Sequence, residues 1–208
     1  MKHLDLNTFM IDVHQNAVAH GWHDKERSDG TVRSLFHCEL SEAVESYRKG
    51  EPDWWHRCPY APGACETQEV HENESLHCEA CSDSARKPEG AAVEFVDFVI
   101  RVFDYFGSIC FVLPQALDTA DKLAAWAVDD YQDDESNNVT SLDAADFADV
   151  LHTHIALSKV MHNVTYLTCA VGLVLAWIKK RGMDPVKILL EKHEYNKSRS
   201  YRHGGKVC

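Results

Sequence analysis

Two pairs of carboxylates are the residues of this chain best suited to chemistry. Glu39 and Glu42 form the first pair, and Glu94 and Asp97 form the second. Residues three apart share one face of a helix, and both pairs stand among apolar neighbours. Four converging carboxylates would repel one another in a core, and a hard divalent cation such as Mg²⁺ removes that cost because it prefers oxygen ligands. The spacing indicates a magnesium site, with two solvated acidic faces as the alternative.

Each acidic pair belongs to a longer segment, 37–45 (HCELSEAVE) for the first and 94–105 (EFVDFVIRVFDY) for the second. These segments, followed by the C-terminal residues 192–206, resemble the phage and bacterial branch of the MazG-like nucleotide pyrophosphohydrolases. Residues 21–27 and 87–90 also fit that branch, which is part of the all-α NTP pyrophosphatase superfamily. The resemblance implies a helical bundle in which Mg²⁺, or Mn²⁺ in its place, is held by four catalytic carboxylates: Glu39, Glu42, Glu94 and Asp97.

The function implied by the resemblance is Mg²⁺-dependent hydrolysis of a (deoxy)nucleoside triphosphate to the monophosphate and pyrophosphate. One alternative keeps the site and changes the substrate to another pyrophosphate, such as a nucleotide alarmone. Another is a zinc-bearing interaction protein without activity. The base stays open, because stacking aromatics such as Trp22, Trp54 or Trp55 accept any base face. Which carboxylate takes a proton from the attacking water also stays open.

The C-terminal stretch 187–206 is the basic part of an acidic chain. Lys and Arg number 21 against 33 Asp and Glu, a formal charge of −12, so general binding of nucleic acid is not expected. By the resemblance, tail positions face the nucleotide, and Arg and Lys suit phosphate groups. The expected substrate-binding residues are Lys192, Asn196, Arg199, Arg202 and Lys206. The alternative is a frayed basic terminus.

A Cys/His-rich insertion, 51–89, separates the two acidic pairs and is longer than the family's usual spacer. Cys78 and Cys81 form a C-x-x-C, and Cys58 and Cys65 form a looser arm. Clustered thiols in a reducing compartment suit a tetrahedral structural Zn²⁺. We expect zinc at these four cysteines, against the alternative of unrelated thiols in a flexible loop.

Apolar residues recur at helical spacing through nearly all of the chain, and no convincing strand alternation interrupts them. The predicted class is therefore all-α. Capping residues and glycines set the expected limits. The expected helices run from 6 to 21, 28 to 50, 90 to 107, 114 to 128, 142 onward, 164 to 181 and 184 onward.

A chain of 208 residues suits one domain, 1–208, which here contains an additional helical segment at 108–181. Residues 169–182 can be laid on 94–107, with Cys169 and Gly172 at the acidic positions. The segment is thus predicted to be a degenerate second half that packs as a dimer partner would, with a chance likeness as the alternative.

The longest apolar stretch, 164–178, is too short to span a bilayer, and no signal-peptide pattern opens the chain. A cytoplasmic protein with no membrane partner is expected. The resemblance also implies a homo-oligomer, in the form of a dimer.

Overall fold

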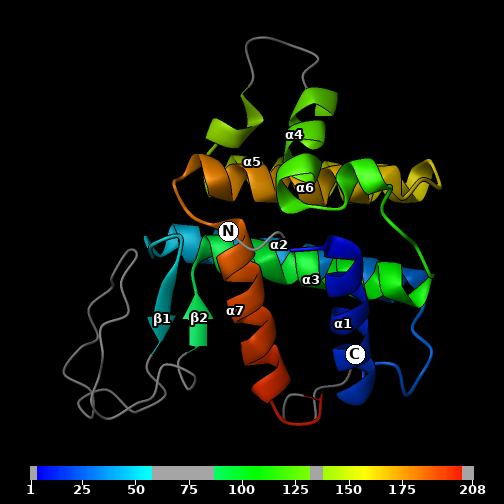
Figure 1. Cartoon of the computed structure of the whole chain (residues 1–208). Helices are drawn as coiled ribbons and strands as arrows, with labels where there is room; N and C mark the ends of the chain where they lie inside the picture. The colour runs from blue at the N-terminus through cyan, green and yellow to red at the C-terminus, as the bar shows by residue number, and fades with distance from the viewer. Residues whose placement is uncertain (1–3, 58–86, 132–137, 203–208) are drawn as a thin grey trace, which may run out of the picture.

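Helices make up most of the residues described by the computed structural model, which are 4–57, 87–131 and 138–202 (Figure 1). This confirms the predicted all-α class. In chain order the α-helices are α1 (Leu6–Ala19), α2 (Asp29–Arg48), α3 (Ala91–Ser108), α4 (Ala120–Tyr131), α5 (Ala144–Val160), α6 (Thr165–Lys180) and α7 (Pro185–Ser198). None of the described helices has the combination of length and apolar character needed to cross a bilayer.

Several helices begin at a residue whose side chain caps the first turn. Asp5 accepts a hydrogen bond from the Thr8 amide before α1, and Ser28 accepts one from the Thr31 amide before α2. Asp143 and Asp184 cap α5 and α7 in the same way. Such caps satisfy amide groups that the helix leaves without partners. They explain why the sequence located these helix starts to within about two residues.

Four helices form the centre of the molecule. α2 packs on α3 and α5 packs on α6, and the two pairs meet where α2 contacts α5 and α3 contacts α6. On the outside, α1 and α7 pack on α3, whereas α4 packs on α6 (Figure 1). The segment 108–181 therefore forms a second helical group stacked on the group that carries the acidic pairs.

An aromatic cluster joins the two groups in the core. The ring of Phe95 on α3 lies 5.1 Å from Trp177 on α6 and 5.2 Å from Phe147 on α5, between ring centroids. Phe147 and Trp177 stack at 5.4 Å. All three side chains are fully buried. Ring pairs of this kind add about 0.5–1.5 kcal/mol beyond the burial of their area, so the two groups share one core.

Two short strands, β1 (Trp55–Arg57) and β2 (Lys87–Glu89), pair antiparallel, with His56 opposite Pro88. The expectation of a chain without strands is wrong at this point, because three-residue strands are too short to show alternation. The pairing holds the N-terminus of α3 against residues 52 and 53. A Cβ at Gly90, whose φ is 110°, would lie 2.4 Å from the Pro52 carbonyl oxygen, so only glycine permits this approach.

The helix expected over 114–128 is divided. A 3₁₀ turn, η2 (Gln115–Leu117), precedes α4, which begins only at Ala120. The break at Asp118 has a structural use, because its carbonyl accepts the Leu6 amide at 2.8 Å and so covers the start of α1. A second 3₁₀ turn, η3 (Val139–Ser141), leads into α5. Sequence periodicity cannot register such a tertiary hydrogen bond.

Candidate active site

The two acidic pairs converge between α2 and α3. Glu39, Glu42 and Glu94 each offer a carboxylate oxygen, and these atoms all lie within 4.8 Å of one another. Glu39 and Glu94 are buried and Glu42 is exposed. Asp97 is not part of this tight group, but it lines the same cavity one turn further along α3. The spacing seen in the sequence thus corresponds to one continuous acidic face.

A cavity of about 330 Å³ opens above this face, bounded by side chains of α1, α2, α3 and α7 and of the turn between α1 and α2. The lining of the cavity also carries positive charge. Its basic lining residues are Arg27, Lys87, Arg101, Lys192 and Arg199.

Two of these cations are already paired with the acidic face. Lys192 on α7 is 2% exposed, and its Nζ lies 2.8 Å from Oδ2 of Asp97. The side-chain amide of Asn196 donates to Oδ1 of Asp97 at 3.4 Å. Arg101 Nε donates to Glu39. Lys192 and Arg101 thus each pair with one of the four carboxylates.

Burial disfavours the charged forms of the inner carboxyl groups. Burial raises the pKa of Glu39, although Arg101 opposes this effect. Burial and the charge of Asp97 raise the pKa of Glu94 to about 8. Burial alone would lower the pKa of Lys192, but Asp97 and Glu94 raise it above its ordinary value, so the ammonium group stays charged. The charge of Lys192 therefore offsets only part of the effect of burial on Glu94.

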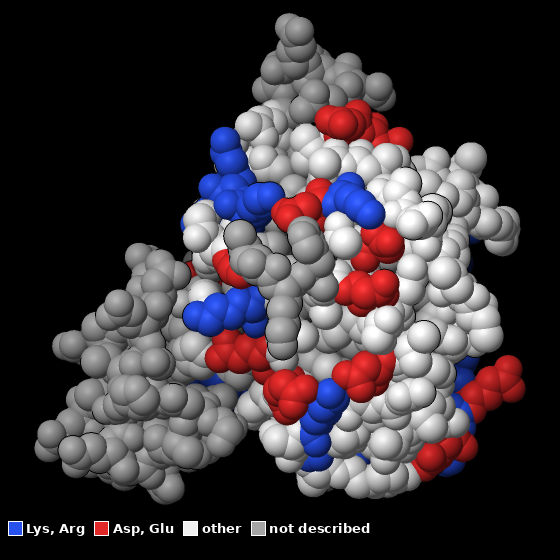
Figure 2. Space-filling model, viewed as in Figure 1, with Lys and Arg blue, Asp and Glu red and all other residues white. Residues whose placement is uncertain are grey.

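The predicted tail residues separate into three groups. Lys192, Asn196 and Arg199 line the cavity. Arg202 does not: its Nε donates to the Gly21 carbonyl at 3.2 Å, and its Nη2 lies 3.3 Å from Asp24. The tail is thus tied to the turn after α1 there. Lys206 lies outside the described residues. The face shown in Figure 2 carries acidic side chains interspersed with Lys and Arg, not a field of one sign.

Arg199 differs from the other basic lining residues. Arg27 lies 3.3 Å from Asp104, and Lys87 lies 2.8 Å from Glu89. Within the described part of the chain, no carboxylate lies within ion-pair distance of Arg199, whose guanidinium is 6.0 Å from the Tyr195 ring centroid. Because it faces the cavity without an acidic partner there, Arg199 is the cation best placed to meet an anion.

Of the three tryptophans considered for base stacking, only Trp22 lines the cavity. Trp54 is buried under Lys187, whose Nζ lies 4.8 Å from a ring centroid, and Trp55 is covered by Arg57 at 5.6 Å. Trp22 is therefore the candidate of these three for contact with a base.

The four cysteines of the expected zinc site, Cys58, Cys65, Cys78 and Cys81, lie outside the described residues. The zinc site stays a prediction of the sequence.

Sequence reasoning missed two features of the cavity. It did not assign Arg27 or Lys87 to the site, although both fall in segments that fit the family. It also did not foresee that Arg101 and Asp104 take different partners, with Arg101 on Glu39 and Asp104 on two histidines. The spacing could have placed Asp104 on the cavity side of α3, because it follows Asp97 by seven residues and so lies on the same helix face.

Comparison of the chain with protein-family models, curated proteins and solved structures gives no match. Function is therefore inferred from the residues of this chain and from their geometry.

Proposed function

We propose that this protein is a Mg²⁺-dependent pyrophosphohydrolase that converts a (deoxy)nucleoside triphosphate to the monophosphate and pyrophosphate. The observation that supports this most is the group of Glu39, Glu42 and Glu94, whose oxygens lie within 4.8 Å of one another at a cavity that basic residues also line. Carboxylates for a hard cation and cations for phosphate are the two requirements of this chemistry.

The residues present fit a magnesium ion. The donors are all carboxylate oxygens, which Mg²⁺ prefers as ligands. Burial and the charge of Asp97 raise the pKa of Glu94 to about 8 although Lys192 opposes this effect, so a bound cation would favour the charged form. Mg²⁺, or Mn²⁺, would be held by Glu39, Glu42, Glu94 and Asp97. When bound, it supplies a Lewis acid for phosphate oxygens and for the attacking water.

The chain's own residues would divide the remaining work. Arg199 binds an outer phosphate, because a guanidinium can donate two parallel hydrogen bonds to it. Lys192 and Arg101 hold Asp97 and Glu39 in place. Trp22 offers an aromatic surface to the base. A cavity of about 330 Å³ lies within the range of about 300–1,000 Å³ typical of ligand sites.

A substrate panel tests the proposal. The purified chain is incubated with each common NTP and dNTP and with a nucleotide alarmone, in Mg²⁺ or in EDTA, and pyrophosphate and monophosphate are measured. The same preparation carrying Glu42→Gln measures contaminating phosphatases. Mg²⁺-dependent release of pyrophosphate from a triphosphate supports the proposal. Turnover of the alarmone alone favours the alternative substrate class, and no turnover of any member favours the non-enzymatic alternative.

A further inference from the structure

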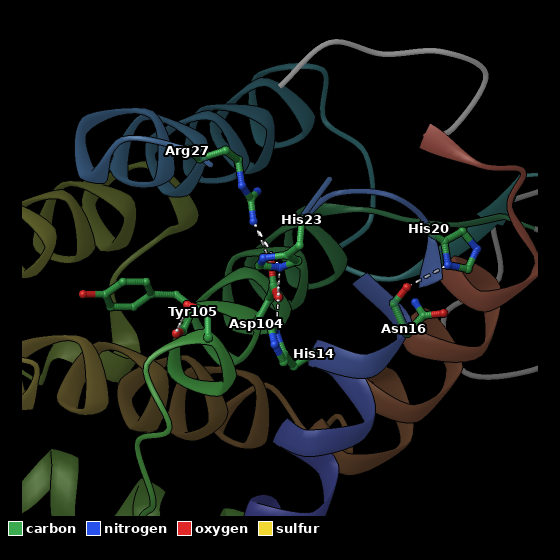
Figure 3. Close-up of polar contacts among 8 residues, drawn as sticks. His14, Asn16, His20, His23, Arg27, Asp104 and Tyr105 are labelled. Atoms are coloured by element: carbon green, nitrogen blue, oxygen red, sulfur yellow. Dashed lines mark hydrogen bonds and ion pairs between the residues drawn. The ribbon is translucent and has the colours of Figure 1, made fainter. Parts of the chain in front are cut away.

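A second cluster of metal-ligating side chains lies beside the cavity (Figure 3). His14 comes from α1, His23 from the turn after it, and Asp104 from α3. Oδ1 of Asp104 lies 2.8 Å from Nδ1 of His14 and 2.7 Å from Nε2 of His23. The two imidazole rings meet at 79°, with centroids 4.7 Å apart. Both ring nitrogens thus lie against one carboxylate oxygen, and the three atoms lie within 4.8 Å of one another.

The fold builds this cluster through two glycines. A Cβ at Gly107 would lie only 2.5 Å from Cβ of His14, so α1 can approach α3 this closely only where α3 has a glycine. Gly107 follows Asp104 by three residues and lies on the same helix face. Gly21, with φ of 76°, turns the chain at the end of α1 so that His23 also reaches Asp104.

We infer that His14, His23 and Asp104 bind a divalent transition metal ion such as Zn²⁺ or Co²⁺, at a site separate from the all-oxygen group on α2 and α3. Two imidazoles and one carboxylate form a donor set that suits these ions, whereas Mg²⁺ prefers oxygen alone. Ligands at about 2.0–2.2 Å from a tetrahedral ion lie about 3.3 Å apart, so the observed contacts need to open by only about 0.5 Å.

The cluster also leaves room for a further ligand. The side chains of His14, His23 and Asp104 are 26%, 25% and 14% exposed, so one side of the centre faces solvent. A site with three protein ligands and one open position is the arrangement of reactive or exchangeable metal sites and not of closed structural ones.

Arg27 competes with an ion for this position. Its Nη2 lies 3.3 Å from Nε2 of His23 and 3.3 Å from Oδ2 of Asp104. A guanidinium and a metal ion would repel each other there, so the ion displaces Arg27 from Asp104. Arg27 already lines the cavity and is long enough to turn towards it. Removing the Arg27 side chain is therefore expected to increase the affinity of the cluster for the metal ion.

The test is a titration of the full-length, tag-free protein with Co²⁺, followed by visible absorption and calorimetry. Excess Mg²⁺ keeps Co²⁺ away from the acidic group on α2 and α3. The wild type is expected to bind one Co²⁺ with a nitrogen and oxygen ligand-field spectrum, which differs from the thiolate charge-transfer bands that cysteines give. His23→Gln and Asp104→Asn each lower the affinity for this ion by at least about a hundredfold. Arg27→Gln strengthens it several-fold.

His20→Gln is the matched control, because His20 stands at the end of α1, where its Nδ1 contacts the Asn16 carbonyl and not Asp104 (Figure 3). It should keep wild-type Co²⁺ binding. The glutamine variants retain an amide donor for Asp104, and their metal-free Tm shows that they fold. If no such Co²⁺ binds, or if His23→Gln and Arg27→Gln leave binding unchanged, the cluster is a hydrogen-bond network and the proposal is rejected. The readout is binding alone, so this failure would leave the pyrophosphohydrolase proposal unaffected.

Discussion

α3 and α6 occupy corresponding places in the two helical groups, but the cavity described above is lined by α3 and not by α6. Each is the inner helix of its group: α3 packs against α1 and α2, and α6 packs against α4 and α5. α3 presents Glu94 and Asp97 to the cavity. α6 carries Cys169 and Gly172 at the positions that align with them, and both are buried.

The difference lies in what covers each helix. A Cβ at Gly172 would lie 2.5 Å from the Leu123 carbonyl oxygen and 2.5 Å from Cβ of Ala127, so α4 fills the space directly. Cys169 points its thiol at the Ala127 carbonyl, 3.9 Å away, and burial raises the pKa of this thiol to about 12. Over α3, the α7 side chains Lys192, Asn196 and Arg199 line a cavity instead. Whether such a buried helix lines a cavity therefore depends on the helix that packs over it, which is α7 for α3 and α4 for α6.

This contrast agrees with the predicted degenerate second half, in which the acidic positions have been lost and the space closed. The internal repeat itself stays a prediction.

The largest effect is expected at the cavity beside α2 and α3, where a substitution should change turnover. Glu42→Gln removes one charge from the acidic group at nearly constant volume, so turnover at saturating Mg²⁺ should fall at least about a hundredfold. Glu45→Gln makes the same change one turn further along α2, where the side chain is exposed and 3.5 Å from Arg48. It should leave turnover nearly unchanged. Equal turnover rates for the wild type and Glu42→Gln would contradict the assignment of Glu42 to the metal site.

Next in size is the loss of the phosphate contact. Arg199→Ala should raise KM by about ten- to a hundredfold, as expected for charge-assisted hydrogen bonds, and the effect should shrink at high salt. Arg202→Ala is the control, since this nearby arginine pairs with Asp24 outside the cavity. Steady-state kinetics of both variants decide the matter. Similar changes in KM would mean that the tail acts only through general charge.

At the close contact between α6 and α4, a substitution is expected to change the stability of the fold. Gly172→Ala should lower the free energy of unfolding by about 1–3 kcal/mol, because the added methyl group meets the α4 backbone. Gly30→Ala on α2 meets only Ser28 Oγ at 3.7 Å and should be neutral or stabilising. Denaturant unfolding of both variants measures this. A neutral Gly172→Ala would show that α4 does not hold α6 as closely as described.

The remaining effect concerns pH. The folded state raises the pKa of Glu94 from 4.5 to about 8, so it binds this proton more tightly than the unfolded chain does. The stabilisation is complete below 4.5 and is lost as pH rises through 8. In EDTA, the Tm of the wild type should therefore fall relative to Glu94→Gln across this range, and Mg²⁺ should reverse the trend.

Cys169→Ala provides the comparison on α6, because a thiol whose pKa is raised to about 12 does not titrate in this range. The difference in Tm between wild type and Cys169→Ala should be independent of pH. A sloping difference for Cys169, or a flat one for Glu94, would contradict the electrostatic account.

Sequence alone was sufficient for features set by local spacing. Caps such as Ser28 and Asp184 located helix starts, and the i, i+3 pairs placed carboxylates on single faces of α2 and α3. Features set by packing were not accessible. Arg101 contacts Glu39, 62 residues away, and His14 contacts Asp104, 90 residues away. No local pattern selects between such partners, and the three-residue strands are below the length at which alternation is informative.

The buried pair of Lys192 and Asp97 has a consequence for how this protein could change during evolution. Losing Asp97 would strand a buried ammonium group, at a cost of about 3–5 kcal/mol. If the proposed reaction were no longer needed, Asp97 and Lys192 would therefore still be retained because folding requires them. Glu42 is exposed and has no cation within ion-pair distance among the described residues. Folding does not depend on it, so it would be the first of these residues to be substituted. Among divergent copies, the residue at this position is the better marker of retained catalysis.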